Sequence, residues 1–337
     1  MLKKLNIKNL LPGDIILVGY NDRDSREIQQ RTNSKFSHSM LYWYGSVIHA
    51  SDIVITENPS RMLFEENEGV CILRLKDDYW NPYRISAIID YARTFVGTFY
   101  DRKALIAMRD GKKVMPKENR QMCARFVAEC YDYVCLDLVK NYEICTPEEI
   151  LNSTILNRIS NPLLEATQED VDMAASFDVT KVQFKAIKEF LISLKKQFPH
   201  EDIVSLNQVE QFIEKDPSNS DCVLNLLKQT EYFNLWKIEK EHNPYLYDVV
   251  SFKNKWKDCA KDQALSVIRD SKRIIKEKKR DINVYKLKIL EIGDIVYYHD
   301  MITLRENIIE TANERIDVAE QVLMGLGIVK IKFPWCL

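Results

Sequence analysis

The chain has little glycine, with 9 glycines among 337 residues. Ordinary usage of about 7% would give about 24. It contains neither a G-x-G-x-x-G nor a G-x-x-x-x-G-K-[ST] motif, which excludes dinucleotide-binding and P-loop sites. Six of the nine glycines lie in the first 111 residues, and the next is Gly293. Because tight turns favour residues that tolerate positive φ, the long glycine-free stretch predicts helices.

Metal motifs and long apolar runs are also missing. The eight cysteines form no C-x-x-C pair and no Cys/His cluster with zinc spacing, so we expect no metal and no cofactor. No apolar run approaches 18 residues, and Lys8 interrupts the N-terminal segment, so neither a membrane span nor a signal peptide is predicted. We therefore expect a cytoplasmic protein with free thiols, with leaderless export left open.

Charge is balanced along the chain, which has a net charge of −2. Residues up to Ser160 hold 22 basic and 21 acidic side chains, and the rest hold 26 and 29. This balance argues against general nucleic-acid binding. A basic stretch runs from Arg269 to Arg280. It fits a solvated helical face, and contact with a membrane or a protein partner is the open alternative.

The two halves of the chain differ in pattern, which predicts a domain of residues 1–160 and a mainly helical accessory domain of residues 161–337. In the first domain, apolar and β-branched runs predict strands at 15–18 and 70–75. They also predict a hairpin within 37–50 that turns at Tyr44-Gly45-Ser46. The polar stretch at 21–35 predicts a loop or short helix. Helical periods and a capping box at Thr146 predict helices at 85–96, 123–134 and from 147 onward.

In the second domain, we expect helices at 180–197, 203–215, 219–241, 253–281 and 302–325, and a final strand at 328–333.

Cys123 is the candidate nucleophile because it opens the predicted helix 123–134. Unpaired N–H groups and the positive end of the dipole at a helix N-terminus favour a thiolate and lower the pKa of a cysteine. The same N–H groups can bind an oxyanion. The alternative is an inert core cysteine, which is what we expect of Cys130 on the same face.

His38 and His49 fall on the two strands of the predicted hairpin. If the connecting loop holds an even number of residues, both side chains project from one face of the sheet. A histidine pair in that position suits a general base and the residue that orients it. The sequence leaves the loop length open, and His49 also fits a satisfied core histidine.

Six short segments resemble those of the circularly permuted papain-like (NlpC-type) cysteine hydrolases, which include the lecithin–retinol acyltransferase-like enzymes. In chain order they are LPGDIIL (11–17), SHSM (37–40), GSVIHA (45–50), VGTFYD (96–101), MCARFV (122–127) and TPEEIL (146–151). The histidine segments precede the cysteine segment, as in the permuted order. The resemblance covers about residues 10–157 and says nothing about the rest of the chain.

The resemblance implies an α+β fold in which a small antiparallel sheet packs on the helix that bears the nucleophile. By position it implies Cys123 as nucleophile, His38 as base and His49 as the third polar residue. Tyr100 is a candidate residue of the substrate cleft, and a core aromatic is the equal alternative. The acyltransferase-like N-C-x-x-F segment is replaced here by Met122-Cys123-Ala124-Arg125-Phe126, which argues against lipid acyl transfer.

The sequence leaves three functions open. The first is a cysteine hydrolase of amide, peptide or isopeptide bonds that acts through an acyl-thioenzyme, with the helical domain selecting a substrate or protein partner. The second is a thiol-dependent lipid acyl hydrolase or acyltransferase, which an exposed apolar helix face or membrane contact by residues 269–280 would favour. The third is a helical binding or effector protein with a non-catalytic papain-like module.

Overall fold

The computed structural model describes residues 1–109 and 119–328. The chain divides into two compact units. The first comprises Met1–Thr180 and Leu191–Glu210, and the second comprises Lys181–Phe190 and the chain from Gln211 onward. Among the described residues, no helix is both long enough and apolar enough to cross a membrane. The α+β fold class predicted from the sequence is confirmed.

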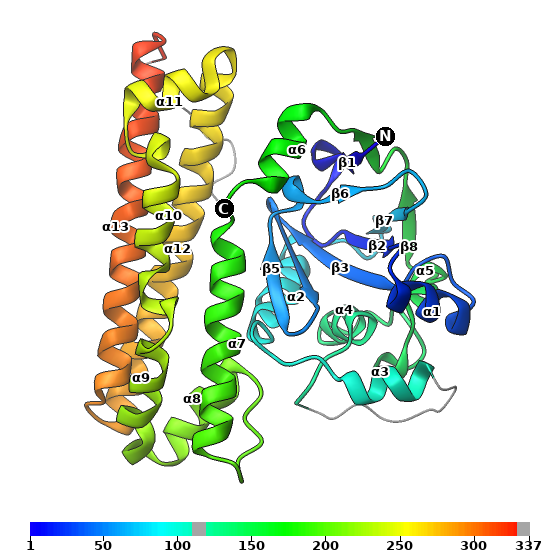
Figure 1. Cartoon of the computed structure of the whole chain (residues 1–337), viewed down its shortest axis with the longest axis horizontal. Coiled ribbons are helices and arrows are strands. Elements are labelled where there is room, and N and C mark those ends of the chain that lie inside the picture. The colour runs from blue at the N-terminus through cyan, green and yellow to red at the C-terminus, as the bar shows by residue number, and fades with distance from the viewer. Residues whose placement is uncertain (110–118, 329–337) are drawn as a thin grey trace. The chain divides into compact units, whose positions relative to one another are not determined.

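The first unit is built on a six-stranded antiparallel sheet with strand order β5-β4-β3-β2-β7-β8 (Figure 1). Its strands are rich in β-branched and aromatic residues. They are β2 (Ile15–Gly19), β3 (His38–Trp43), β4 (Ser46–Ala50), β5 (Val54–Glu57), β7 (Gly69–Leu75) and β8 (Leu156–Ile159). A second sheet has the order β6-β1-β9 and consists of β1 (Lys3–Leu5), β6 (Leu63–Phe64) and β9 (Leu163–Glu165).

The hairpin of β3 and β4 turns on a two-residue loop. Trp43 pairs with Ser46, and between them Tyr44 and Gly45 have φ values of 32° and 76°. Two successive residues with positive φ match the twist of the flanking strands, which is why glycine is favoured there. The predicted hairpin is confirmed, and its loop holds an even number of residues.

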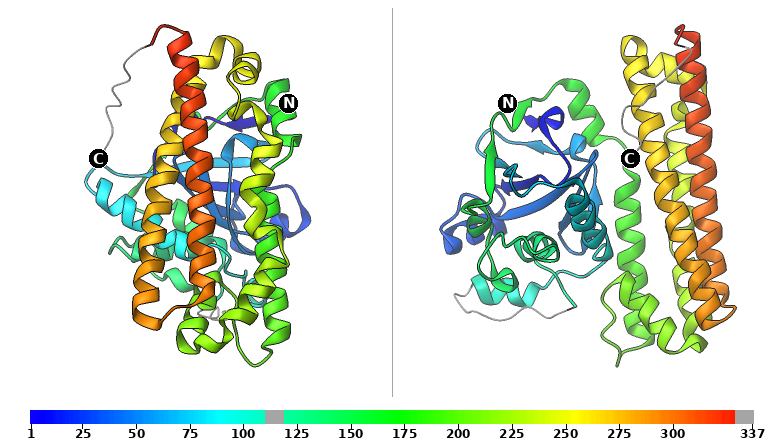
Figure 2. Two further views of the ribbon diagram at one scale, coloured as in Figure 1. Left: turned by 90° about the vertical axis from the view of Figure 1, so that its left-hand side faces the viewer. Right: turned by 180° about the vertical axis from the view of Figure 1, so that it is seen from behind.

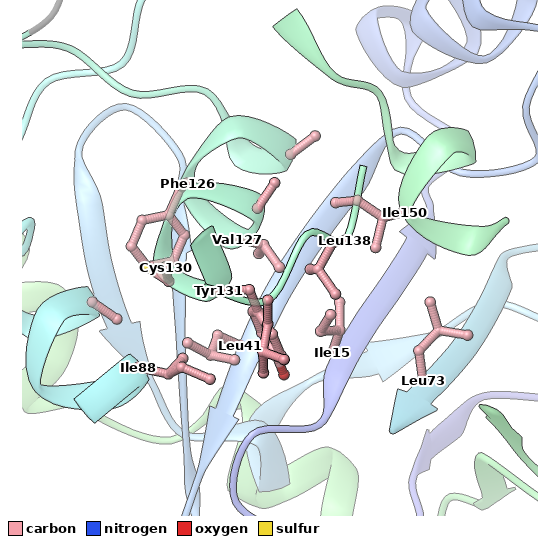
Figure 3. Close-up of a cluster of buried hydrophobic side chains, with 14 of the residues drawn as sticks. Ile15, Leu41, Leu73, Ile88, Phe126, Val127, Cys130, Tyr131, Leu138 and Ile150 are labelled. Carbon is pink, nitrogen blue, oxygen red and sulfur yellow. The ribbon is translucent and has the colours of Figure 1, made fainter. Parts of the chain in front are cut away.

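One face of the six-stranded sheet is covered by α2 (Pro82–Thr94) and α4 (Cys123–Asp132). Figure 3 shows the buried side chains between them, with Phe126 and Tyr131 of α4 among strand residues such as Leu41. The opposite face carries a second apolar cluster that includes Met40 and Val47 and packs against Phe64 of β6. Because side chains alternate along a strand, odd and even residues of β3 enter different clusters.

The Pro-Gly-Asp turn before β2 is structural. The Asp14 carboxylate is fully buried and accepts two hydrogen bonds from Arg74, at 2.8 and 2.7 Å. Gly13 has a φ of +87°, and a Cβ there would lie 2.6 Å from Ile85 Cδ1. Its carbonyl accepts a hydrogen bond from the Tyr131 hydroxyl. These contacts fix the start of β2 to α4, so this motif positions the sheet.

Shorter elements complete the first unit. Asp22 caps α1 by accepting a hydrogen bond from Ser25 N at 2.9 Å, and Thr146 and Glu149 form the predicted capping box of α5. The remaining helices are α1 (Arg23–Thr32), α3 (Arg102–Arg109), α5 (Pro147–Leu151), α6 (Gln168–Ala175) and the 3₁₀ turns η1 (Ile7–Asn9), η2 (Pro59–Arg61) and η3 (Tyr142–Ile144).

The described part of the second unit is helical. Its two longest helices, α12 (Ala260–Ile292) and α13 (Val296–Gly325), lie side by side (Figures 1 and 2). Ala260, Ala264 and Ile268 recur every four residues of α12 and share an apolar cluster with Val322 and Leu323 of α13, as expected for one helix face. The other elements are η4 (Pro217–Asn219), α9 (Ser220–Lys228), η5 (Glu231–Asn234), α10 (Leu235–His242), η6 (Pro244–Leu246), α11 (Val249–Trp256) and η7 (Lys257–Cys259).

Helices α7 (Val179–Gln197) and α8 (Leu206–Lys215) contribute residues to both units. The predicted single helix at 219–241 is wrong, because Thr230 leaves the helix and its hydroxyl caps η5. The single helix at 253–281 is also wrong, because Lys257 has a φ of 40° and separates α11 from α12. The final strand predicted at 328–333 lies outside the described residues, Ile328 excepted. The domain boundary at residue 160 stays a prediction.

Candidate active site

Cys123 is the first residue of α4, and the end of the helix around it has no side-chain cap. The preceding Met122 is extended, with φ −122° and ψ 153°, and its apolar side chain accepts no hydrogen bond from the first turn. The first N–H groups of a helix have no partner within the helix and carry its positive dipole end. Cys123 is 6% exposed, so these groups surround a nearly enclosed thiol.

Tyr100 is brought to the thiol by backbone pairing. It forms a parallel bridge with Gln121, which comes two residues before the nucleophile. The Asp101 N–H donates to the Gln121 carbonyl at 2.8 Å, and the Gln121 N–H donates to the Phe99 carbonyl at 3.0 Å. The Tyr100 hydroxyl faces Cys123. Burial, followed by the charge of the Cys123 thiolate and hydrogen bonding to it, raises the pKa of Tyr100 well above its usual value. The tyrosine therefore lies at the candidate nucleophile, while its role in binding substrate stays a prediction.

A buried polar cluster holds the segment in front of α4. The Gln121 side chain is fully buried and donates to Glu129 Oε2 at 2.7 Å. The other Glu129 oxygen accepts from the Tyr91 hydroxyl at 3.2 Å, and Arg125 Nε lies 3.5 Å from Glu129 Oε2. Since buried polar groups are costly unless paired, this cluster ties residues 121–129 to α2.

The pKa of the Cys123 thiol is raised, and the sequence-based expectation of a lowered value is wrong. Burial is the largest cause of the rise, because a desolvated thiolate is unfavourable. The Ser39 backbone and hydroxyl, the Ala124 N–H and the Tyr100 hydroxyl face the sulfur. Hydrogen bonding from these groups to the ionised thiolate acts in the opposite direction and lowers the pKa. The resting group is therefore a neutral thiol whose ionised form has several donors around it.

Ser39 is a site residue that the sequence interpretation missed. It is fully buried on β3, and its hydroxyl has no hydrogen-bond partner in the described part of the structure. An unpaired buried hydroxyl costs free energy, and the Cys123 thiolate is the group that it would stabilise. The only signal in the sequence is its place beside His38.

His38 and His49 are in direct contact. His38 Nε2 lies 2.8 Å from His49 Nδ1, and the rings meet edge to face with centroids 5.0 Å apart. The hairpin register pairs Leu41 with Ile48, and continuing it puts both histidines on one face of the sheet. The inference from loop parity is therefore confirmed.

Glu57 extends the histidine pair, and it too was missed. Its Oε2 lies 3.1 Å from His49 Nε2. In the sheet, Glu57 stands opposite Val47 and His49 stands opposite Ile55, so the two side chains are diagonal neighbours on one face. The signal was present in the sequence as a glutamate that ends the β-branched run after the hairpin.

The structure shows no hydrogen bond between the histidine pair and the Cys123 thiol. His38 and His49 lie on the sheet face of Met40 and Val47, whereas α4 packs on the opposite face. The Cys123 thiol instead reaches the start of β3, where its Sγ lies 3.7 Å from the carbonyl oxygen of Ser37. Although both side chains are described, no hydrogen bond links Sγ to the His38 ring. Proton transfer from Cys123 to His38 therefore requires the His38 ring to come within hydrogen-bond reach of Sγ.

Two causes lower the pKa of His38 well below its usual value. Burial is the larger, and the charge of the neighbouring His49 is the second. Its ring centroid is also 6.1 Å from that of Tyr20. His38 is therefore neutral at physiological pH, as a general base must be before it accepts a proton.

The described residues contain no group of three or more His, Cys, Asp and Glu side chains that could hold a metal ion. Residues 9–160 match the model of the family described as permuted papain-like amidase enzyme, YaeF/YiiX, C92 family. The N-terminal part of this chain is similar to the permuted papain-like amidases.

One solved structure similar to the chain is titled as the crystal structure of metalloprotein yiiX from Escherichia coli O157:H7, DUF1105. It is 16% identical, the match covers 45% of this chain and 97% of that one, and the TM-score is 0.37. No curated protein matches the chain.

The family match confirms the resemblance to permuted papain-like enzymes that the motifs predicted. It supports a cysteine-dependent amidase or peptidase at the level of the family, over residues that include Cys123, His38 and His49. The roles of these residues, the substrate and the function of the helical part stay predictions.

Proposed function

We propose that the protein hydrolyses an amide, peptide or isopeptide bond by thiol catalysis at Cys123. The observation that carries the proposal is the convergence of hydrogen-bond donors on the buried thiol at the uncapped start of α4. Donors aimed at a nucleophile and at the oxyanion that it forms are the main means by which a protein accelerates acyl transfer. The similarity of residues 9–160 to permuted papain-like amidases supports the bond type.

The steps begin from a neutral thiol and a neutral imidazole. Cys123 Sγ attacks the carbonyl carbon while its proton passes to His38, and the carbonyl electrons move to the oxygen. His38 then gives this proton to the leaving nitrogen as the C–N bond breaks, which leaves an acyl-thioenzyme. Water attacks that carbonyl and gives a proton to His38. Cleavage of the C–S bond then releases the acid, and Cys123 regains its proton.

The residues around the thiol have separate roles in this proposal. The N–H group of Ala124, with the other free N–H groups of the first turn, binds the oxyanion. Tyr100 and Ser39 donate to the sulfur. His49 orients His38 through the 2.8 Å contact between their rings. We also propose that residues 161–337 form an accessory domain that selects a substrate or a protein partner.

The test is acylation by an activated ester. p-Nitrophenyl acetate passes through the same tetrahedral intermediate and leaves an acetyl group on the thiol, which peptide mass spectrometry assigns to a cysteine. We expect rapid acetylation of Cys123, with a burst of p-nitrophenol, and loss of both in the Cys123→Ala and His38→Ala variants. The exposed Cys135 and Cys259 are internal references. Acetylation spread over the exposed cysteines, with Cys123 unmodified, would contradict the proposal and favour a non-catalytic binding module.

A second candidate, hydrolysis or transfer of acyl groups on lipids, is favoured by one feature of α12. Val284, Leu287 and Leu290 are spaced by three residues and are 45%, 57% and 81% exposed. They follow the basic stretch from Arg269 to Arg280 on the same helix. Apolar residues on a basic helix are typical of membrane-surface contact.

Liposome flotation tests this candidate. Binding to vesicles that contain phosphatidylserine, reduced in a variant with Leu287→Ser and Leu290→Ser, would support lipid substrates. Absence of binding to both anionic and neutral vesicles would remove that support. It would leave amide hydrolysis untouched, because the ester assay does not depend on membranes.

A further inference from the structure

Glu57, His49 and His38 form a chain of hydrogen-bonding groups that ends at one unpaired nitrogen. The contacts run from Glu57 Oε2 to His49 Nε2 at 3.1 Å, and from His49 Nδ1 to His38 Nε2 at 2.8 Å. Both ring nitrogens of His49 are therefore engaged. In the described part of the structure, His38 Nδ1 has no hydrogen-bond partner.

Chemistry fixes the direction of this chain. A carboxylate is ordinarily ionised at neutral pH and can only accept hydrogen bonds, so His49 Nε2 carries a proton. In its neutral form His49 has only one protonated nitrogen, so in that form His49 Nδ1 must be an acceptor. It accepts from His38 Nε2–H, which leaves the lone pair of neutral His38 on Nδ1.

We propose that Glu57 is a positioning residue that fixes the tautomers of both histidines and thereby makes His38 Nδ1 the basic atom of the site. This inference rests on the proposed function, because it names the nitrogen that takes the Cys123 proton. When His38 becomes protonated at Nδ1, its Nε2–H keeps its bond to His49. The Glu57 carboxylate then offsets the new positive charge through the His49 ring.

The position of Glu57 suits this role. The His49 side chain is 7% exposed and that of Glu57 is 31% exposed, so the chain runs from a buried imidazole to a carboxylate that water still reaches. Among the described residues, Tyr20 is an ionisable group that lies beside the pair, against the His38 ring. Burial, then the charges of Glu57, Glu68 and Asp22, raise the pKa of Tyr20, so it stays neutral and does not replace the carboxylate.

The first test reads the tautomers directly and needs no enzymatic activity. The chain has 5 histidines, so ¹⁵N-histidine labelling of the full chain gives few signals in a long-range ¹H–¹⁵N spectrum, and single-histidine variants assign them. We expect protonated Nε2 and unprotonated Nδ1 in both His38 and His49. In Glu57→Ala, His49 should lose its single tautomer, whereas the matched Glu66→Gln variant should leave both rings unchanged. Protonated Nδ1 in wild-type His49 would overturn the proposal.

The second test follows acetylation of Cys123 by p-nitrophenyl acetate across pH. Removing the carboxylate disfavours the imidazolium, so Glu57→Ala should lower the rate about tenfold and move its acid limb to lower pH. Glu57→Asp should restore part of the rate, and Glu57→Ala should add nothing in a His38→Ala background. The role of Glu57 would be overturned if Glu57→Ala leaves the acid limb of the pH–rate profile at the same pH. It would also be overturned if Glu57→Ala lowers the rate equally in the wild-type and His38→Ala backgrounds.

The two tests separate the two failures. If Cys123 is not acetylated in the wild-type protein, the proposed function fails while the spectrum still decides the tautomers. If Cys123 reacts and His49 has the opposite tautomer, only the positioning role of Glu57 fails.

Discussion

The two ends of α4 carry buried cysteines in contrasting surroundings. Cys123, at the start, and Cys130, two turns later, are 6% and 0% exposed. Burial is the main cause of a raised pKa at both thiols, and at Cys130 the charge of Glu129 adds to it. At Cys123 the Ser39, Ala124 and Tyr100 donors act against burial. Cys130 instead belongs to the apolar cluster around Phe126 and Tyr131.

Burial alone therefore does not distinguish a core cysteine from a candidate nucleophile. The difference is which groups face the sulfur. At the start of a helix, N–H groups are free and neighbouring segments can add donors. In the last turn of α4, the N–H group of Cys130 is paired within the helix, and its thiol lies among apolar side chains. Substitutions at each end can separate these two environments.

The largest expected effect comes from replacing each of the two cysteines by alanine in separate variants. Cys123→Ala should abolish acetylation of this site and lower the hydrolytic rate by roughly 10⁴-fold or more, since the nucleophile is lost. Cys130→Ala should keep the rate per folded molecule. Burst kinetics with p-nitrophenyl acetate measure both, and an equal loss in the two variants would mean that α4 acts only as packing.

Removing the base should have the next largest effect. His38→Ala should slow acetylation of Cys123 by about 10²- to 10⁴-fold, the range for general base catalysis. The exposed Cys135 of the same molecule should react as before, which excludes unfolding as the cause. Site-resolved mass spectrometry gives both rates, and an unchanged rate at Cys123 would remove His38 from the mechanism.

A smaller effect is expected from the hydroxyl that faces Cys123. Tyr100→Phe removes one donor to the sulfur and should slow acetylation about tenfold, in line with a hydrogen bond to a charged group. Tyr131→Phe is the matched control at the other end of the helix, where the hydroxyl donates to the Gly13 carbonyl. It should lower stability and leave the rate of acetylation unchanged. The opposite pattern would reverse the assignment of the two tyrosines.

The smallest expected effect is on folding. Cys130→Ala removes one buried sulfur from a packed cluster and should lower the free energy of unfolding by about 1–2 kcal/mol, the cost of a small cavity. Urea denaturation followed by circular dichroism measures it. If Cys130→Ala keeps its stability and loses hydrolytic activity, Cys130 and not Cys123 would be the functional thiol.

Local patterns in the sequence predicted much of the first unit. Alternation and turn residues gave the β3–β4 hairpin, the Thr146 capping box gave α5, and spacing gave α4. These features depend on residues close together in the chain, so their physics can be read locally. The histidine pair also followed from pattern, because its geometry depends only on the length of one loop.

Features that depend on distant contacts were not predictable in this way. The pKa of Cys123 depends on how deeply the thiol is buried and on Ser39 and Tyr100, which arrive from other strands and loops. Glu57 comes into contact with His49 only through the pairing of β4 with β5. In the second unit, periodicity indicated helices but missed the break at Lys257, because its positive φ has no glycine to mark it.

The most direct test of the central claim compares Cys123 with a free thiol as the pH falls. An ordinary thiol such as N-acetylcysteine reacts as the thiolate, so between about pH 8 and about pH 6 its rate falls roughly 100-fold. The pKa of His38 is lowered by burial and by His49, so its neutral form persists over this range and still accepts the Cys123 proton.

Acetylation of Cys123 by p-nitrophenyl acetate should therefore change little over this range. The ratio of its rate constant to that of N-acetylcysteine should rise about 100-fold as the pH falls. A constant ratio, with both rates falling in parallel, would show that Cys123 reacts as an unassisted thiolate and would contradict the account.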